Sequence, residues 1–165
     1  MNISDETLWD EAERAIKLIG DRFGEYVNYA HDYGHEEGFF ARLKRFLGRE
    51  NMEDYVWMWE KPNRPHTYVR FENLQDSPDL RKLTPNTQEP VWFVVEIWSL
   101  SGWPVYEGML REIEEITEAA PIINYFVIAE DFSWLIAKNR RNEFIAIGEE
   151  VEDNLRRFQT ETEET

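Results

Sequence analysis

Two histidines, His31 and His35, come closest in this sequence to the spacing of a metal site. They stand four residues apart, and on a helix such a pair can bind zinc together with a nearby carboxylate such as Glu36 or Glu37. Gly34 lies between them, and no helical periodicity surrounds them, so a polar loop with exposed histidines is the other interpretation. We predict that the chain binds no metal and no cofactor.

Glu96 is the carboxylate whose position favours an altered pKa. It interrupts an apolar strand face between Val94 and Trp98, where burial would raise the pKa of its side chain. A place near a sheet edge, or an ion pair with Arg70 or Arg111, is the alternative. A two-carboxylate hydrolase needs a second acid across a cleft, and the sequence nominates none. Since it also lacks a Gly-x-Ser-x-Gly elbow and a phosphate-binding glycine loop, we predict no catalytic residue; a small hydrolase using Glu96 is an alternative.

The segment from Leu100 to Tyr106 carries the predicted contact with a partner. It places Trp103 and Tyr106 on a connection that we expect at the surface, and Pro104 restricts its backbone. Exposed aromatic side chains are frequent hot spots of protein interfaces, although Trp103 could instead fold back into the core. The acidic residues that follow complete the predicted partner-binding site: Glu107, Glu112 and Glu115.

The charge of the chain indicates what kind of partner to expect. The formal net charge is −16, from 34 acidic and 18 basic residues. Such a field repels nucleic acids and anionic lipids but attracts basic proteins, among them many toxins and nucleases. A requirement for solubility alone would also explain this net charge. A further alternative is an anti-defence protein of a phage or plasmid that mimics DNA with the acidic residues of two helices, 105–119 and 149–158.

The spacing of apolar residues predicts the elements that position these groups. Helices are expected at 4–19, 39–47, 105–119 and 149–158, and strands at 54–60, 67–72, 91–99, 122–129 and 143–148. Residues 132–137 form either a further strand or an extended turn. The stretch 73–90 is a loop with one helical turn near Leu80. The order predicts an α+β fold with a single mixed β-sheet, helices packed on it, an N-terminal helix and a closing C-terminal helix.

The sequence also predicts the extent of the domain and its location in the cell. We expect one domain over residues 1–159 and an acidic, disordered tail over 160–165. The sequence has no cysteine, no secretory signal and no apolar run of the ~18 residues that a membrane span needs, so we expect a cytoplasmic protein. The helix at 39–47 carries the main basic island of the chain: Arg42, Lys44, Arg45 and the adjoining Arg49.

The C-terminal third has a recognisable pattern. Tyr106-Glu107-Gly108 enters a helix, the run from Tyr125 to Asn139 reads YFVIAEDFSWLIAKN, and the strand EFIAIG follows from Glu143. This pattern resembles a family of small bacterial α+β proteins and, more loosely, the SUKH-type immunity proteins that neutralise toxins. The resemblance implies an α+β fold and a partner-masking role. Together with the charge, it predicts an immunity-like inhibitor that masks a basic protein partner.

Overall fold

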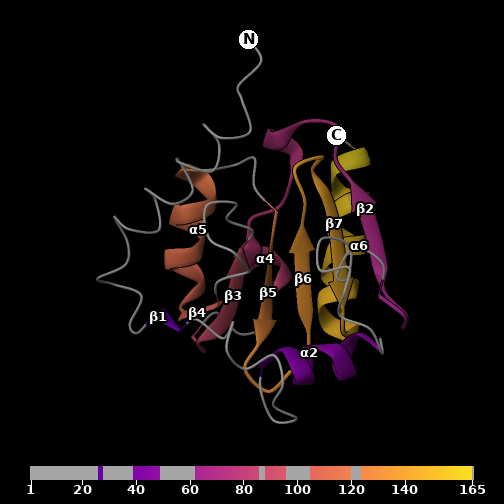
Figure 1. Cartoon of the computed structure of the whole chain (residues 1–165). Coiled ribbons are helices and arrows are strands. Elements are labelled where there is room, and N and C mark those ends of the chain that lie inside the picture. Colours follow the sequence, from indigo (N-terminus) through magenta and orange to yellow (C-terminus); the bar gives the residue numbers. More distant parts are fainter. Residues whose placement is uncertain are drawn as a thin grey trace.

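The computed structural model describes residues 26–27, 39–48, 62–85, 88–95, 105–119 and 124–164 (Figure 1). Its strands form one seven-stranded sheet in the order β1-β4-β3-β5-β6-β7-β2. They are β1 (Tyr26–Val27), β2 (Thr67–Arg70), β3 (Val91–Val95), β4 (Val105–Gly108), β5 (Tyr125–Ala129), β6 (Leu135–Lys138) and β7 (Glu143–Ile147). The helices are α2 (Phe39–Leu47), the short 3-10 helix η3 (Leu74–Asp76), α4 (Leu80–Leu83), α5 (Leu110–Ala119) and α6 (Glu149–Glu163).

The predicted α+β class, with one sheet, helices packed on it and a closing C-terminal helix, is confirmed. The strand directions differ from the expected mixed sheet, because every pairing among the described strands is antiparallel. The predicted order of a strand at 91–99, a helix and a strand at 122–129 gives no parallel pair, because β3 and β5 pair antiparallel and β4 stands between β3 and α5 in the sequence. Strands β4 and β5 run in the same direction with α5 between them in sequence, but β3 lies between them in the sheet and pairs with both.

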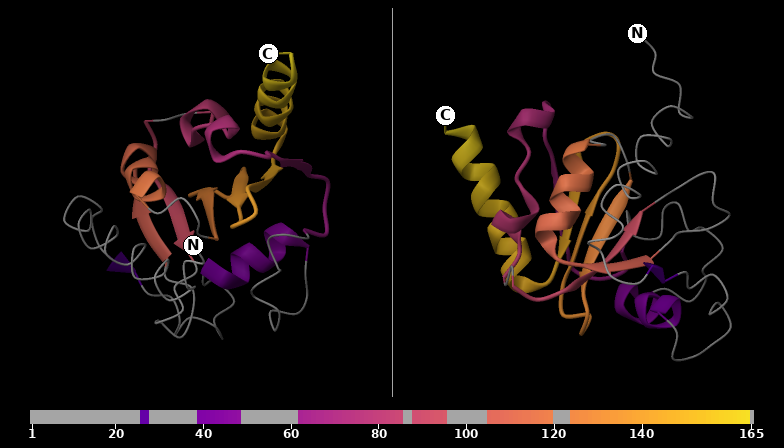
Figure 2. Two further views of the ribbon diagram at one scale, coloured as in Figure 1. Left: turned by 90° about the horizontal axis from the view of Figure 1, so that it is seen from above. Right: turned by 90° about the vertical axis from the view of Figure 1, so that its left-hand side faces the viewer.

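Helices cover both faces of the sheet. Figure 2 shows α4, α5 and α6 on one face and α2 on the other. The first face buries Phe93, Val127 and Ile136, and the second buries Phe126 and Ala137. Because both faces are covered, β5 and β6 are buried along their whole length. The prediction that the strand beginning at Val91 is central is confirmed for β3; residues 96–99 lie outside the described part.

The helix α2 ends where the sequence predicted. Leu43 and Leu47 are fully buried against the sheet, and Gly48 follows with a positive φ of 69°. A Cβ at Gly48 would come within 2.9 Å of the Asn63 carbonyl oxygen, so this turn requires glycine. The Asn63 backbone N–H donates to the Leu47 carbonyl at 3.0 Å and its side-chain amide to that of Gly48 at 3.2 Å, which satisfies the open end of the helix.

The predicted helix over 105–119 is wrong at its beginning. Residues Val105–Gly108 form strand β4, and α5 begins at Leu110. Val105 and Tyr106 pair with Val94 and Phe93 of β3. A β-branched and an aromatic residue suit this pairing, which overrides the helical spacing of the apolar residues downstream.

The predicted disordered tail is also wrong, since α6 continues to Glu163. The hydroxyl groups of Thr160 and Thr162 donate to the carbonyls of Arg156 and Phe158, at 3.0 and 2.9 Å. The glutamates of this segment are good helix formers, so the helix extends beyond the last turn that packs on the sheet. The expected helix at 4–19 and strand at 54–60 lie outside the described residues.

Candidate partner-binding surface

The residues predicted to bind a partner do not come together on one surface. Tyr106 is 6% exposed, and its ring packs against Phe93 with the ring centroids 6.2 Å apart. The expectation that Tyr106 lies exposed on a connection is therefore wrong, because its strand directs the side chain into the core between the sheet and α5. Trp103 lies outside the described residues, as do Glu96, His31 and His35.

Of the three glutamates in the predicted site, Glu107 lies on one side of the sheet, and Glu112 and Glu115 of α5 lie on the other. Residues alternate between faces along β4, so Glu107 takes the face opposite to that of Tyr106 and stands across from Trp92. Glu115 is exposed on α5, over the other face. Glu112 is partly buried, and its Oε2 atom has no hydrogen-bond partner among the described residues. Among the predicted site residues that the structure describes, Glu112 and Glu115 of α5 are the two that can share one surface.

Glu107 belongs instead to a small carboxylate cluster at the turn after β5. Partial burial, a hydrogen bond and charge from Glu107, and the charge of Glu89 raise the pKa of Glu130. A hydrogen bond between two carboxyl groups requires a proton on one of them, so this pair holds a proton more readily than isolated acids do. The described residues contain no group of three His, Asp or Glu side chains placed to hold a metal ion.

The acidic side chains are concentrated on the helices of one sheet face. We call the helices α5 and α6 with their carboxylates the acidic layer. Helix α5 has four glutamates and one arginine, and α6 has six acidic residues and two arginines. Arg156 is paired with Glu152 and Asp153 of its own helix. The exposed carboxylates of the layer are Glu115, Glu118, Glu149, Glu150, Asp153, Glu161 and Glu163.

On the opposite face, the described helix α2 is basic. Helix α2 has three basic residues and no acid. The Arg42 guanidinium lies over the ring of Phe132 at 4.3 Å, and Arg64 lies over Phe46 at 4.4 Å while donating to the Phe46 carbonyl at 3.0 Å. These contacts hold basic groups against the surface of α2. The predicted basic island is confirmed for its described residues, and it lies across the sheet from the acidic layer (Figure 2).

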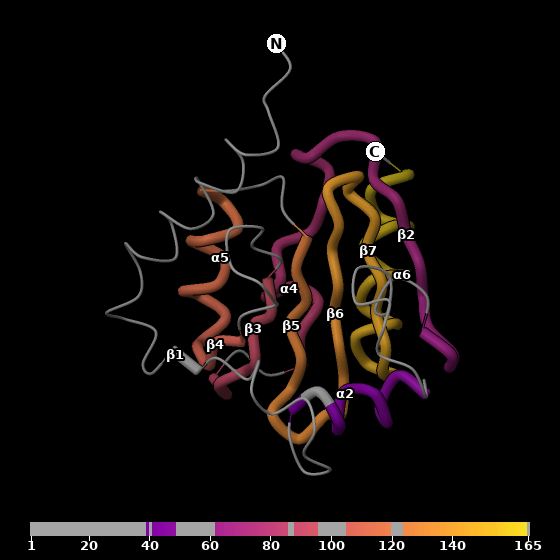
Figure 3. Tube along the Cα trace, in the orientation of Figure 1, coloured from indigo at the N-terminus to yellow at the C-terminus, as the bar shows by residue number. Residues whose placement is uncertain are grey.

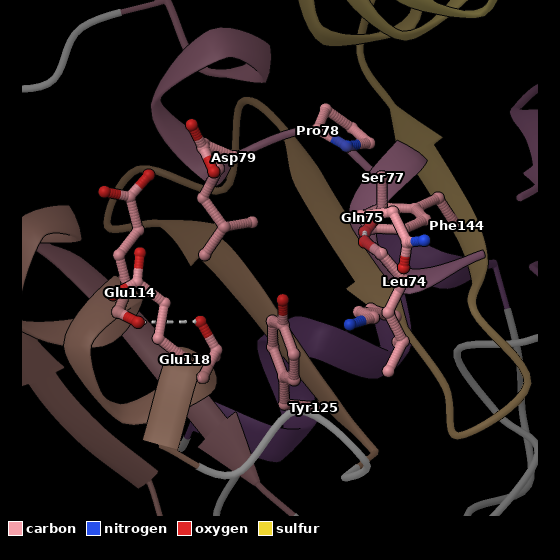
Figure 4. Close-up of a pocket in the computed structure, with 12 residues that line it drawn as sticks. Leu74, Gln75, Ser77, Pro78, Asp79, Glu114, Glu118, Tyr125 and Phe144 are labelled. Atoms are coloured by element: carbon pink, nitrogen blue, oxygen red, sulfur yellow. Dashed lines mark hydrogen bonds between the residues drawn. The ribbon is translucent and has the colours of Figure 1, made fainter.

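A cavity beneath the acidic layer was missed by the sequence reasoning. Figure 4 shows it between the η3–α4 segment, α5 and the sheet. Its volume is about 240 Å³, and Tyr125, Lys138 and Phe144 form its floor. The signal was present in the sequence, because Lys138 ends the fully buried strand LIAK, where an apolar residue is expected. Burial lowers the pKa of the Lys138 amine to about 8.

In the part of the chain that the structure describes, every helix is too short or too polar to cross a bilayer. Neither the curated proteins nor the solved structures contain a match to the chain. The model of DUF6756, described as a family of unknown function, matches residues 13–159. The chain therefore belongs to the DUF6756 family.

Proposed function

We propose that this chain is a non-enzymatic, immunity-like inhibitor that masks a basic protein, such as a toxin or a nuclease, with its acidic layer. The observation that supports the proposal is the contrast in charge between the described helices on the two faces of the sheet. The acidic layer covers one face, and the basic helix α2 covers the other. A field with this direction orients an approaching basic protein before contact and raises its association rate.

The composition of the layer favours a protein partner over the alternative role as a DNA mimic. Helix α4 contacts both α5 and α6, and its Arg81 and Lys82 are exposed. The two acidic helices are thus separated by the Lys82 ammonium group and by the Arg81 guanidinium, which is paired with Glu114. Mimicry of a duplex requires continuous rows of negative charge, whereas a protein surface with basic and acidic groups can complement this pattern.

The proposal is tested by reversing charge on the layer. We expect the immobilised wild-type protein to retain a basic protein from a lysate of its own host, with recovery that falls as salt rises. The double variant Glu115→Lys/Glu118→Lys should weaken that complex by about tenfold, mainly through slower association. The matched control is Glu89→Lys/Glu107→Lys, in the carboxylate cluster around Glu130, which makes the same change in net charge away from the layer and should bind normally.

The outcomes separate the alternatives. Equal weakening by both double variants would show that only net charge matters and would contradict the proposed surface. Failure to retain any basic protein in a salt-dependent way would also count against it. A duplex DNA competitor added to the complex decides between the two roles. Release of the partner by DNA supports mimicry, and a complex unaffected by DNA supports the masking of a protein surface.

A further inference from the structure

The cavity below the acidic layer contains a lysine in an unusual place. The register puts Tyr125, Lys138 and Phe144 side by side on three adjacent strands, facing the helices. Lys138 is 7% exposed, and its amine lies 5.8 Å from the centroid of the Phe144 ring. Tyr125 is 3% exposed on the other side. Lys138 therefore stands between two aromatic residues in the floor of the cavity, with its amine near the Phe144 ring.

The environment makes this amine more nucleophilic than an ordinary lysine. Desolvation lowers the pKa of Lys138 to about 8, so the neutral amine is far more abundant at neutral pH than for an exposed lysine. The Tyr125 hydroxyl is protonated at neutral pH, and burial raises its pKa further above its ordinary value. The floor of the cavity thus provides a nucleophilic nitrogen beside a hydroxyl group that can donate a hydrogen bond.

The remaining lining decides which ligands fit. The loop side contributes Leu74 and Pro78, and the α4 and α5 side contributes Asp79, Glu114 and Glu118. Figure 4 shows the Tyr125 hydroxyl pointing into the space between these two sides. The carboxylates repel an anionic ligand, while the apolar and aromatic side chains favour a small, uncharged ligand.

Glu114 keeps the α5 side of the cavity in place. It is 6% exposed, and its carboxylate accepts hydrogen bonds from the backbone N–H of Arg81, at 2.9 Å, and from the Arg81 guanidinium. This contact joins α5 to α4 across the roof of the cavity. The cavity is therefore walled by elements that are fixed to one another.

We propose that Lys138 is a carbonyl-reactive lysine whose cavity takes small, uncharged aldehydes or ketones. The lone pair of the neutral amine attacks the carbonyl carbon, a C–N bond forms, and the carbonyl oxygen receives the proton that the nitrogen releases. The resulting carbinolamine loses its hydroxyl group and a second nitrogen-bound proton as water, which leaves a C=N bond. The step needs no oxidant, reductant or cofactor, and it is independent of the proposed masking function.

The experiment traps the C=N bond in the full-length protein. Benzaldehyde serves as the uncharged probe, cyanoborohydride reduces the adduct to a stable secondary amine, and peptide mass spectrometry locates it. We expect Lys138 to be modified at about tenfold lower benzaldehyde concentration than the exposed Lys82, which is the internal reference. The variant Lys138→Arg keeps a cation but forms no C=N bond, and it should lose this modification while Lys82 is unaffected.

A second probe tests the ligand class. Glyoxylate is an aldehyde with a carboxylate in place of the phenyl ring, and we expect it to modify Lys138, relative to Lys82, less than benzaldehyde does. Equal modification of Lys138 and Lys82 by benzaldehyde would overturn the proposal, and preference for glyoxylate would overturn the uncharged class. Folding of the Lys138→Arg variant is checked by circular dichroism. If that variant does not fold, the ratio of Lys138 to Lys82 modification in the wild type still decides.

Discussion

The Lys138 amine is buried between the sheet and the helices that cover it, so its positive charge lowers the free energy of unfolding. The pKa of Lys138 falls from 10.5 in the unfolded chain to about 8 in the folded protein, because burial disfavours the cation. Between these two values the unfolded chain binds more protons than the folded one. The free energy of unfolding therefore rises with pH across that window, and below pH 8 the penalty from this group is complete and no longer changes with pH.

The variant Lys138→Met tests this penalty. At pH 7 we expect it to be more stable than the wild type by roughly 3 kcal/mol, from about 1.4 kcal/mol per pKa unit. The advantage should shrink between pH 8 and 10.5, while Tyr125 titrates in both proteins alike. Urea denaturation at pH 7 and pH 10 measures both differences. A stability difference that does not change with pH would contradict the assignment.

Gly148 occupies a backbone conformation that other residues rarely adopt. Its φ is 116°, and a Cβ there would lie 2.9 Å from the Trp134 Cβ atom and 3.1 Å from the Ser133 carbonyl oxygen. It also caps α6, since its N–H donates to the Glu152 carboxylate at 3.1 Å. The turn after β7, the close contact with Trp134 and the beginning of α6 therefore all depend on Gly148.

We expect Gly148→Ala to destabilise the fold by at least ~2 kcal/mol, because backbone strain and a steric clash act together. The neighbouring substitution Glu149→Ala, at the exposed first residue of α6, is the control and should change stability by less than about 1 kcal/mol. Thermal unfolding followed by circular dichroism measures both. Similar midpoints for the two variants would show that the strand-to-helix turn relaxes easily.

At the level of elements, the edge strand β2 is held by α6 as well as by β7. The Thr67 hydroxyl donates to the Glu152 carboxylate at 3.1 Å and accepts from the Arg156 guanidinium at 2.6 Å. Figure 3 shows β2 outermost beside β7, with β6 and β5 following. These polar contacts connect the edge of the sheet to the helix that covers it.

Replacing Thr67 by valine keeps the shape and strand preference of the side chain but removes both hydrogen bonds. We expect the free energy of unfolding to fall by about 1–3 kcal/mol, because the charged side chains of Glu152 and Arg156 each lose a hydrogen-bond partner. Thr84→Val is the matched control, because the buried Thr84 hydroxyl has no partner among the described residues, and its removal should leave stability unchanged or higher. Equal losses in both variants, measured by urea denaturation, would contradict the role of the Thr67 hydroxyl.

The elements that the sequence predicted correctly are those whose apolar spacing is regular. Helices α2 and α6 and strands β3, β5 and β7 follow such spacing. Strand β4 was missed because its preference depends on pairing with β3, which no local pattern records. Strand β6 begins only at Leu135, because a turn precedes it in which Phe132 has a φ of 58°. A positive φ at phenylalanine cannot be predicted from the sequence pattern. Tyr106 and Lys138 were misplaced or missed for a similar reason, since each depends on which face its strand presents to the helices.

At the level of the whole molecule, the net charge of −16 opposes the compact state. Much of that charge lies on α5 and α6, whose exposed carboxylates repel one another across the acidic layer. Salt screens this repulsion over a distance of about 10 Å at 0.1 M. The stability of the fold should therefore depend on ionic strength.

We expect the thermal midpoint to rise when sodium chloride is increased from low concentration to about 0.5 M, because the Debye length falls well below the spacing of the surface charges. The quadruple variant Glu115→Gln/Glu118→Gln/Glu149→Gln/Glu150→Gln should show a smaller rise. Scanning calorimetry over a salt series gives both slopes. A wild-type midpoint that is insensitive to salt would show that the repulsion is already balanced.

The pairing of β2 with β7 also sets an order of events during synthesis. The Asn142 side chain, at the start of β7, donates to the carbonyl of Phe71, which lies 71 residues earlier. Strands β5, β6 and β7 are joined by short turns and can pair as soon as they are made, but β2 has to wait until the whole intervening chain has closed into a loop. Because β2 leaves the ribosome long before β7, it remains without this sheet partner while the residues between them are made, and it completes its pairing only after β7 emerges.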